Sequence, residues 1–253
     1  MTKAFDVKAI MAGKQAWCNS PEYRALCRQY QEECDRLSRL VRSGGLDLRD
    51  VVEQAEQAVV CTEAAANGTI HRGVYCPSPV IDLIVGNVKR GKLLQRVTAK
   101  SKITHQYGFD VAHRLVCCKS VSKGDVIFTE YLIHQDQAVY AVTLDAHGAI
   151  TAVSEERYCR NRLMKYTYAQ YLPYESALTC VDYRSEEYTY DGDNLCACDV
   201  RTFHPFARTH SREVYRFLHA DGCLSGYTVE EYQGDERVAG VWDDHLFEIK
   251  TKQ

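Results

Sequence analysis

The stretch AVYAVTLDAHGAITAVSEERYCRNRLMKYTYAQYL, residues 138–172, decides the fold. It contains three short runs rich in β-branched and aromatic residues, Ala138–Leu144, Ile150–Tyr158 and Leu163–Leu172. Turn residues separate these runs, first Asp145 to Gly148 and then Arg160-Asn161. Short strands joined by such turns favour an antiparallel meander. Because the first run is apolar on both faces, we expect it to lie in the middle of the sheet.

Similar runs continue on both sides of this stretch. Further strands are predicted at Val126–His134, Cys180–Tyr190, Val214–His219 and Leu224–Tyr232, with turns at Asp191-Gly192 and Asp221-Gly222. In the last of the three runs, one face of the strand is expected to hold Met164, Tyr166, Tyr168 and Leu172, and the other Lys165, Thr167 and Ala169. This alternation predicts a sheet with one face on a core and the other toward solvent.

The N-terminal quarter has the periodicity of helices. Ser20-Pro21 is a favourable helix start, and an apolar stripe follows it at Tyr23, Leu26, Tyr30, Cys34, Leu37 and Val41. We expect this helix to stop at Gly44-Gly45, a second stripe to run from Leu48 to Thr62 and end at Asn67-Gly68, and a shorter helix to occupy residues 3–17. The predicted fold class is therefore α+β, with a helical hairpin over residues 1–67 and an antiparallel sheet over 68–253, forming one compact unit.

Composition excludes some classes of protein. The 253 residues are 45% hydrophobic and 26% charged, with a formal net charge of −3. An extremely basic nucleic-acid-binding protein and an acidic disordered tail are both excluded. The charge is uneven along the chain, however. Residues 68–124 hold 10 basic and 2 acidic side chains, whereas residues 125–253 hold 12 basic and 22 acidic ones. Such an asymmetry bears on partners rather than on fold.

The N-terminal sequence shows no signal-peptide core, and no stretch is apolar enough for a bilayer-spanning helix, so we expect a cytoplasmic protein. In that compartment the 12 cysteines are expected to be mostly reduced packing residues. Cys196-Ala-Cys198 with His204 is the best metal candidate, but its spacing falls short of a structural zinc site. We therefore expect neither a metal nor another cofactor.

Two basic features of the sequence are candidate functional motifs. Gly86 to Lys92 superficially resembles a phosphate-binding loop, but Leu93 replaces the Ser or Thr that would hold Mg²⁺, so a basic turn is favoured. Lys89, Arg90, Lys92, Arg96, Lys100 and Lys102 make a basic stretch with few interleaved aromatic residues. The segment 86–114, with His105 and His113, leaves open an alternative, a nucleic-acid-directed enzyme.

Tyrosine and glutamate recur together in the predicted strands. Glu155-Glu156-Arg157-Tyr158, Ser185-Glu186-Glu187-Tyr188 and Val229-Glu230-Glu231-Tyr232 are the clearest cases. β-propensity alone would explain the tyrosines, but the local excess of acidic residues favours an interaction face that attracts a basic partner. The candidate partner-binding residues are Glu155, Glu156, Glu186, Glu187, Tyr188, Tyr190, Asp191, Glu230 and Glu231. We assign no catalytic residues.

Several of these segments carry a family resemblance. Leu144-Asp-Ala-His-Gly-Ala-Ile-Thr-Ala-Val153, Lys165-Tyr-Thr-Tyr168, Tyr188-Thr-Tyr-Asp191 and Asp221-Gly-Cys-Leu224 resemble the rhythm of YD-repeat (RHS-type) β-meanders. The whole chain is similar in style to the immunity proteins of bacterial polymorphic toxin systems. The resemblance implies a bacterial binding protein without catalysis that neutralises a basic toxin domain by occlusion. A structural or interaction protein in which the sheet is only a scaffold is a further alternative.

Overall fold

The computed structural model describes residues 7–42, 47–86, 88–174, 177–207, 209–220, 222–240 and 245–249. The predicted helix stop at Gly44-Gly45 and the turn residue Asp221 lie outside the described residues. The chain divides into two compact units. We call Asp35–Cys180 the central unit, and Met1–Cys34 together with Val181–Gln253 the terminal unit. The division falls within one helix and one strand, and neither boundary coincides with residue 67.

Strands dominate the structure. They make up 53% of the residues, and helices make up 20%. The antiparallel meander and the helical N-terminus are confirmed, but the chain is mainly β rather than a balanced α+β protein. No helix among the described residues is long and apolar enough to cross a membrane.

The central unit is built on a meander in which chain neighbours mostly pair. Its strands are β1 (Cys61–Ala66), β2 (Lys92–Leu93), β3 (Ile103–Phe109), β4 (Leu115–Ser122), β5 (Asp125–Gln135), β6 (Ala138–Asp145), β7 (Ile150–Cys159) and β8 (Arg162–Tyr174). Their order in the sheet is β8-β7-β6-β5-β4-β3-β1-β2. β6 lies between β5 and β7, as its apolar faces predict. Arg160 and Asn161 turn β7 into β8 with φ of 50° and 63°, the left-handed geometry that suits tight hairpins.

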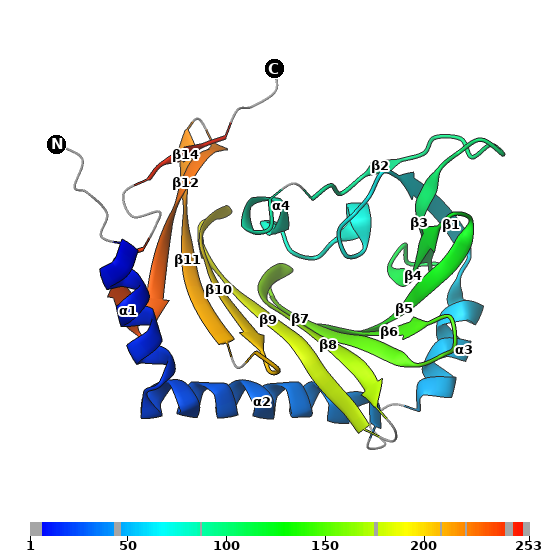
Figure 1. Ribbon diagram of the computed structural model, residues 1–253. Coiled ribbons are helices and arrows are strands. Elements are labelled where there is room, and N and C mark those ends of the chain that lie inside the picture. The colour runs from blue at the N-terminus through cyan, green and yellow to red at the C-terminus, as the bar shows by residue number, and fades with distance from the viewer. Residues whose placement is uncertain are drawn as a thin grey trace. The chain divides into compact units, whose positions relative to one another are not determined.

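Short helices lie on opposite faces of this sheet. α3 (Leu48–Ala58) begins at Asp47, whose side chain accepts a hydrogen bond from the Arg49 amide at 2.9 Å. Its Glu56 accepts a hydrogen bond from Tyr131 on one face. The segment that contains η1 (Gly73–Tyr75) and α4 (Ile81–Ile84) crosses the other face (Figure 1). The two faces of β8 are both covered, because Tyr166 and Thr167 are each buried. The predicted solvent face is therefore wrong for this strand.

The predicted second helix is too long. α3 ends at Ala58, and Cys61–Ala66 is strand β1, which pairs with β3 from Cys61 opposite Phe109 to Ala66 opposite Ile103. Alanine is a good helix former, but here Ala64 to Ala66 are buried between strands. Pairing with residues some forty positions away therefore overrides the local preference.

The terminal unit combines two helices with a second meander. α1 (Val7–Cys18) and α2 (Pro21–Arg42, of which residues 21–34 belong here) precede β9 (Ala177–Asp191, from residue 181), β10 (Asn194–His204), β11 (Thr209–Ala220), β12 (Cys223–Gln233), β13 (Glu236–Val238) and β14 (Phe247–Glu248). The sheet order is β13-β12-β11-β10-β9, and β14 also pairs with β12. The Ser20 cap is confirmed, since its hydroxyl accepts from the Tyr23 amide at 3.0 Å. Strand β10 was not predicted, because its polar residues mask the alternation.

An aromatic core fixes α2 on this sheet. The Tyr30 ring lies 5.5 Å from Tyr183, 5.8 Å from Phe203 and 4.9 Å from His210, centroid to centroid. Tyr23 accepts a hydrogen bond from the His210 amide through its hydroxyl, at 2.7 Å. The apolar stripe predicted for this helix is therefore the face that packs on the sheet.

Candidate functional site

A buried ionic cluster is the most elaborate polar arrangement in the central unit. At its centre is Arg72, which is 3% exposed and has a left-handed backbone with φ of 54°. Two nitrogens of its guanidinium donate to the two oxygens of Glu130, at 2.5 and 3.0 Å. The same side chain donates to Glu156 and, at 3.0 Å, to the Ser154 hydroxyl. One cation therefore joins a loop to strands β5 and β7.

The electrostatics of this cluster favour its charged form. Burial alone raises the pKa of Glu130, but the charges of Arg72 and His71 outweigh burial and lower that pKa to about 2. Bidentate pairs of a guanidinium with a carboxylate have short and directional hydrogen bonds. Leaving either partner unpaired in such a place destabilises the fold by roughly 3–5 kcal/mol.

His71 closes the outer side of the cluster. Its Nε2 lies 3.0 Å from Glu130 Oε1, and its Nδ1 lies 3.1 Å from the Tyr166 hydroxyl. The His71 side chain is 28% exposed, against 5% for Glu130. A general base needs a nitrogen that can reach substrate, and both nitrogens of this ring are engaged. The geometry makes His71 a bridge between strands β5 and β8 rather than a catalytic base.

The backbone of the same loop is held by Tyr107. Its hydroxyl donates to the Arg72 carbonyl at 3.0 Å and accepts from the Val74 amide at 3.2 Å. Gly73 between them has φ of 50°, and a Cβ there would lie 2.6 Å from the Tyr107 oxygen. Only glycine fits this turn without displacing the tyrosine. The cluster thus fixes both the side chain and the main chain of residues 71–74.

Four tyrosines explain much of the tyrosine and glutamate pattern. Each hydroxyl donates to the carboxylate two residues earlier on its own strand, as the alternation of a strand allows. The pairs are Tyr158 with Glu156 at 2.5 Å, Tyr188 with Glu186 at 2.6 Å, Tyr215 with Glu213 at 2.8 Å and Tyr232 with Glu230 at 3.1 Å. Arginines complete several pairs, such as Arg184 with Glu186 at 2.7 Å and Arg216 with Glu230 at 2.9 Å. The repeated Glu-x-Tyr motif therefore forms hydrogen bonds within the protein.

The candidate partner-binding residues consequently separate into two groups. Glu155, Glu156, Glu186 and Tyr188 are 0–4% exposed, with Glu155 held by Arg36 at 2.7 Å. Their burial contradicts the idea that they lie on an outer face and attract a partner. Glu230 and Glu231 are half-buried, as is Tyr190, whereas Glu187 and Asp191 are exposed. Sequence could have shown the Glu-x-Tyr spacing, but nothing in it showed the burial.

The two histidines considered for catalysis are not brought together. His105 is buried on β3, where burial and nearby His71 lower its pKa. His113 lies in the turn beyond Phe109 and stacks on that ring at 4.8 Å. His105 and Phe109 are four residues apart on an extended strand, about 13 Å. This distance does not suit a paired-histidine site.

The cysteines are all free thiols. Five are buried, namely Cys34, Cys117, Cys118, Cys180 and Cys198, so packing accounts for these but not for the exposed ones. His204 pairs with Asp182 at 3.1 Å and lies six residues from Cys198 along β10, about 20 Å. Across the described residues, no group of three or more His, Cys, Asp or Glu side chains is arranged to hold a metal ion.

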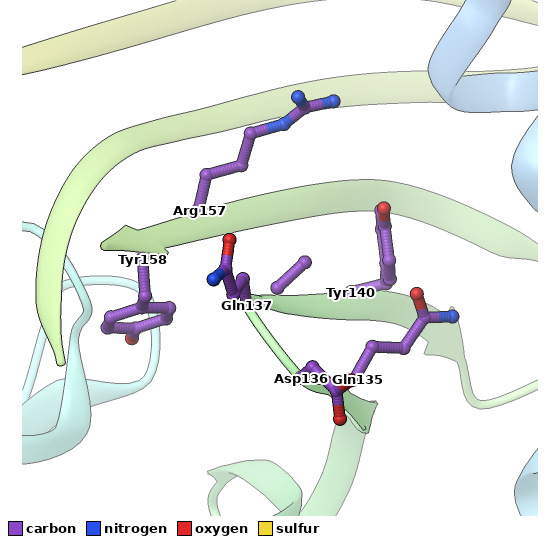
Figure 2. A pocket seen from close by; sticks show the side chains of 7 residues that line it. Gln135, Asp136, Gln137, Tyr140, Arg157 and Tyr158 are labelled. Atoms are coloured by element: carbon purple, nitrogen blue, oxygen red, sulfur yellow. The ribbon is translucent and has the colours of Figure 1, made fainter. Parts of the chain in front are cut away.

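A shallow hollow of about 600 Å³ lies where β5 turns into β6. Figure 2 shows its lining, with Arg157 and Tyr158 on opposite sides of β7. The guanidinium of Arg157 donates to Glu155 at 2.9 Å, and Asp136 is the one carboxylate in the lining. This combination provides hydrogen-bonding groups but neither an activated nucleophile nor a carboxylate pair.

Comparison with known proteins does not identify the chain. No family model matches the sequence, and no curated protein is significantly similar to it. The fold and the cluster define the class of protein only as an antiparallel β-meander with buried ion pairs. The exposed surfaces are therefore the features that can indicate a function.

Proposed function

We propose that the protein works by binding a basic partner protein, with the surface at one end of the terminal unit. A single observation supports this proposal. The solvent-exposed carboxylates of the predicted set, Glu187 and Asp191, lie on β9 on the same face as Leu218 of β11, which is 45% exposed. We call Glu187, Asp191, Leu218 and Leu246 the acidic-apolar surface.

Strand pairing puts these residues on one face. Thr189 pairs with Ala197, and Ala197 pairs with Arg216. Residues two apart on a strand share a face, so Glu187 and Asp191 lie on the side of Leu218. Leu218 pairs with Gly226, and a Cβ on Gly226 would lie 3.2 Å from Leu246 Cδ1. Leu246, 48% exposed, therefore covers the glycine beside Leu218.

The chemistry of this surface suits a basic partner with an apolar centre. Carboxylates at a rim accelerate encounter with a cationic protein, and desolvated apolar side chains slow dissociation. The resemblance to immunity proteins makes a basic toxin domain the partner that we propose. Occlusion needs no catalytic group on this chain, which agrees with a buried cluster whose polar groups bond to one another.

The first experiment identifies the partner and then measures the rates at which it binds and dissociates. The tagged protein is purified from its own host, and the stoichiometric protein that copurifies is expressed separately. We expect Glu187→Lys with Asp191→Lys to slow association at least tenfold and to flatten its dependence on salt. We expect Leu218→Asp to raise the dissociation rate instead. The matched control is Asp125→Lys with Asp136→Lys, which changes the net charge equally at exposed positions of the central unit.

Two results would contradict the proposal. One is an equal loss of association rate in the test and control variants, because only the net charge would then matter. The other is a copurified partner whose own binding surface is acidic. Far-UV circular dichroism on each variant checks that the fold is retained.

A further inference from the structure

The basic segment of the central unit has more cations than its carboxylates neutralise. Of the ten basic residues in 68–124, Arg72, Arg90 and Arg114 are ion-paired with carboxylates. The other seven have no ion pair within the described part of the chain: Lys89, Lys92, Arg96, Lys100, Lys102, Lys119 and Lys123. We call these seven residues the basic surface. All except half-buried Lys119 are exposed.

A pocket of about 650 Å³ begins this surface. It is lined by Asn67, Thr69, Lys89, Arg90, Gly91 and Lys92. Gly91 has φ of +81°, and a Cβ there would lie 2.7 Å from the Gly68 nitrogen and from the Ala66 oxygen. The two backbone segments are thus in close contact, and Lys92 pairs with Ala66 as strand β2. A glycine is required for this approach.

Hydrogen bonds make the pocket well defined. Thr69 donates its amide to the Lys89 carbonyl at 2.8 Å, and its hydroxyl accepts from the Lys89 amide at 2.8 Å. The Arg90 guanidinium donates hydrogen bonds to Asp82 (2.8 Å) and to the Ser78 carbonyl (2.5 Å). The unpaired charge in the pocket therefore comes from Lys89 and Lys92.

The surface continues along an ordered loop. In the loop between β2 and β3, the Leu94 amide donates to the Ala64 carbonyl at 2.8 Å, and the Thr98 amide donates to the Ser101 hydroxyl at 2.9 Å. Val97 of this loop and Lys119 of β4 line one hollow of about 630 Å³. The part of the loop around Val97 therefore lies beside β4, whose hairpin with β5 has Lys123 at its tip.

We propose that the basic surface binds the phosphate backbone of a nucleic acid, with a phosphate group in the pocket at Lys89 and Lys92. Unpaired ammonium and guanidinium groups gain by releasing counterions from a polyanion. The basic surface has seven cations between Lys89 and Lys123, which is more than one isolated phosphate group would require. Few aromatic residues accompany them, so recognition is of the backbone rather than of stacked bases. The net charge of −3 does not oppose this, because salt screens charges beyond about 10 Å.

The neighbouring apolar residues do not make this a membrane-binding surface. Val126, Ile127 and Phe128 are 39–40% exposed on the β4–β5 hairpin. The tip in front of them is polar, however, from Ser122 to Asp125. Insertion into hydrocarbon would bury that tip together with its charges, which is strongly unfavourable.

The test is fluorescence anisotropy with a labelled 20-nucleotide single strand and with the corresponding duplex, repeated over a range of NaCl concentrations. We expect Lys89→Glu with Lys92→Glu to weaken binding at least tenfold. For the single strand we also expect the slope of log affinity against log salt to fall by about 1.4, since each phosphate contact contributes roughly 0.7. The control is Arg24→Glu with Arg28→Glu, two exposed cations of α2, and it should keep most of the affinity. Lys89→Ala with Lys92→Ala, checked by circular dichroism, separates loss of charge from loss of fold.

Three outcomes would overturn this inference. They are no binding of the oligonucleotide at low salt, equal loss in the lysine and arginine variants, and tighter binding to vesicles of anionic lipid than to the oligonucleotide. Displacement by micromolar inorganic phosphate, with no effect of sulfate at equal ionic strength, would assign the pocket to a small ligand and overturn it as well. The acidic-apolar surface is tested by other residues, so the two proposals fail independently.

Discussion

At the scale of the residue, the buried guanidinium of Arg72 has the largest expected effect. It bonds to Glu130 and Glu156, which lie 58 and 84 positions away in the sequence. Burying these charges is unfavourable, and the geometry of the pairs compensates for it. The positions of the partners explain why no sequence pattern pointed to this residue, which is one of ten similar basic residues in its segment.

We therefore expect Arg72→Met to lower the free energy of unfolding by about 3–5 kcal/mol, because two carboxylates would stay buried without their cation. Urea denaturation measures this change. The control is Arg114→Met. The Arg114 side chain pairs with Asp110 but is 56% exposed. That loss should be at most about 1 kcal/mol. Similar losses in the two variants would show that the cluster contributes no more than an ordinary surface pair.

At the scale of the element, the turn at Gly73 depends on a single hydroxyl. A Cβ on Gly73 would lie 2.6 Å from the Tyr107 oxygen and 2.9 Å from His105 Nδ1. Strands of the sheet hold both side chains, so neither can move away freely. The turn is thus specified by one glycine and one tyrosine that are 34 positions apart in the sequence.

A double-mutant cycle tests this dependence. We expect Gly73→Ala to destabilise the protein by more than about 1 kcal/mol through its positive φ and the steric clash. Tyr107→Phe should cost roughly 1–3 kcal/mol by leaving a buried carbonyl unpaired. Because Phe removes the clashing oxygen, the loss in the double variant should be smaller than the sum of the single losses. Thermal unfolding provides all four values, and strict additivity would show that the two residues act separately.

At the scale of the whole molecule, each unit contains a buried histidine whose lowered pKa makes stability depend on pH. In the terminal unit, burial lowers the pKa of His210 to about 4, assisted by the charges of Arg201 and Arg212. Its unfolded pKa is about 6.5, so the unfolded state binds the proton first. Stability from His210 is lost as pH falls from about 6.5 to about 4. In the central unit, burial also lowers the pKa of His105, so this unit too loses stability as pH falls below about 6.5. Glu130, with a folded pKa of about 2, adds a loss between about pH 4.3 and 2.

We therefore expect His210 to contribute a loss of stability in the terminal unit that begins below about pH 6.5. Trp17 contacts Tyr23 edge to face, and the Tyr23 hydroxyl accepts a hydrogen bond from the His210 amide. The fluorescence of Trp17, measured with Trp242 replaced by Phe, therefore reports on the terminal unit. Fluorescence should change between about pH 6.5 and 4. In the variant His210→Phe the fluorescence change should move to lower pH. Coincident transitions in the parent protein and in this variant would contradict the assignment.

Much of the fold could be predicted from sequence alone because it is local. The runs and turns between Val126 and Tyr190 locate strands β5 to β9 to within a few residues, since alternation and tight-turn chemistry act over neighbouring positions. The helix that begins at Ser20 follows from its cap and its apolar stripe. The prediction was wrong for Cys61–Ala66, where a partner strand decides the conformation.

The candidate surfaces show the same division between local and long-range information. The sequence by itself determined the meander, the α2 helix, the Glu-x-Tyr spacing and the concentration of basic residues in 68–124, all of which depend on adjacent or nearby positions. Only the tertiary structure decided which of these charges are neutralised. Burial and ion pairing depend on residues that meet across the sheet, and for that reason Glu186 is buried while Glu187, the next residue, is exposed.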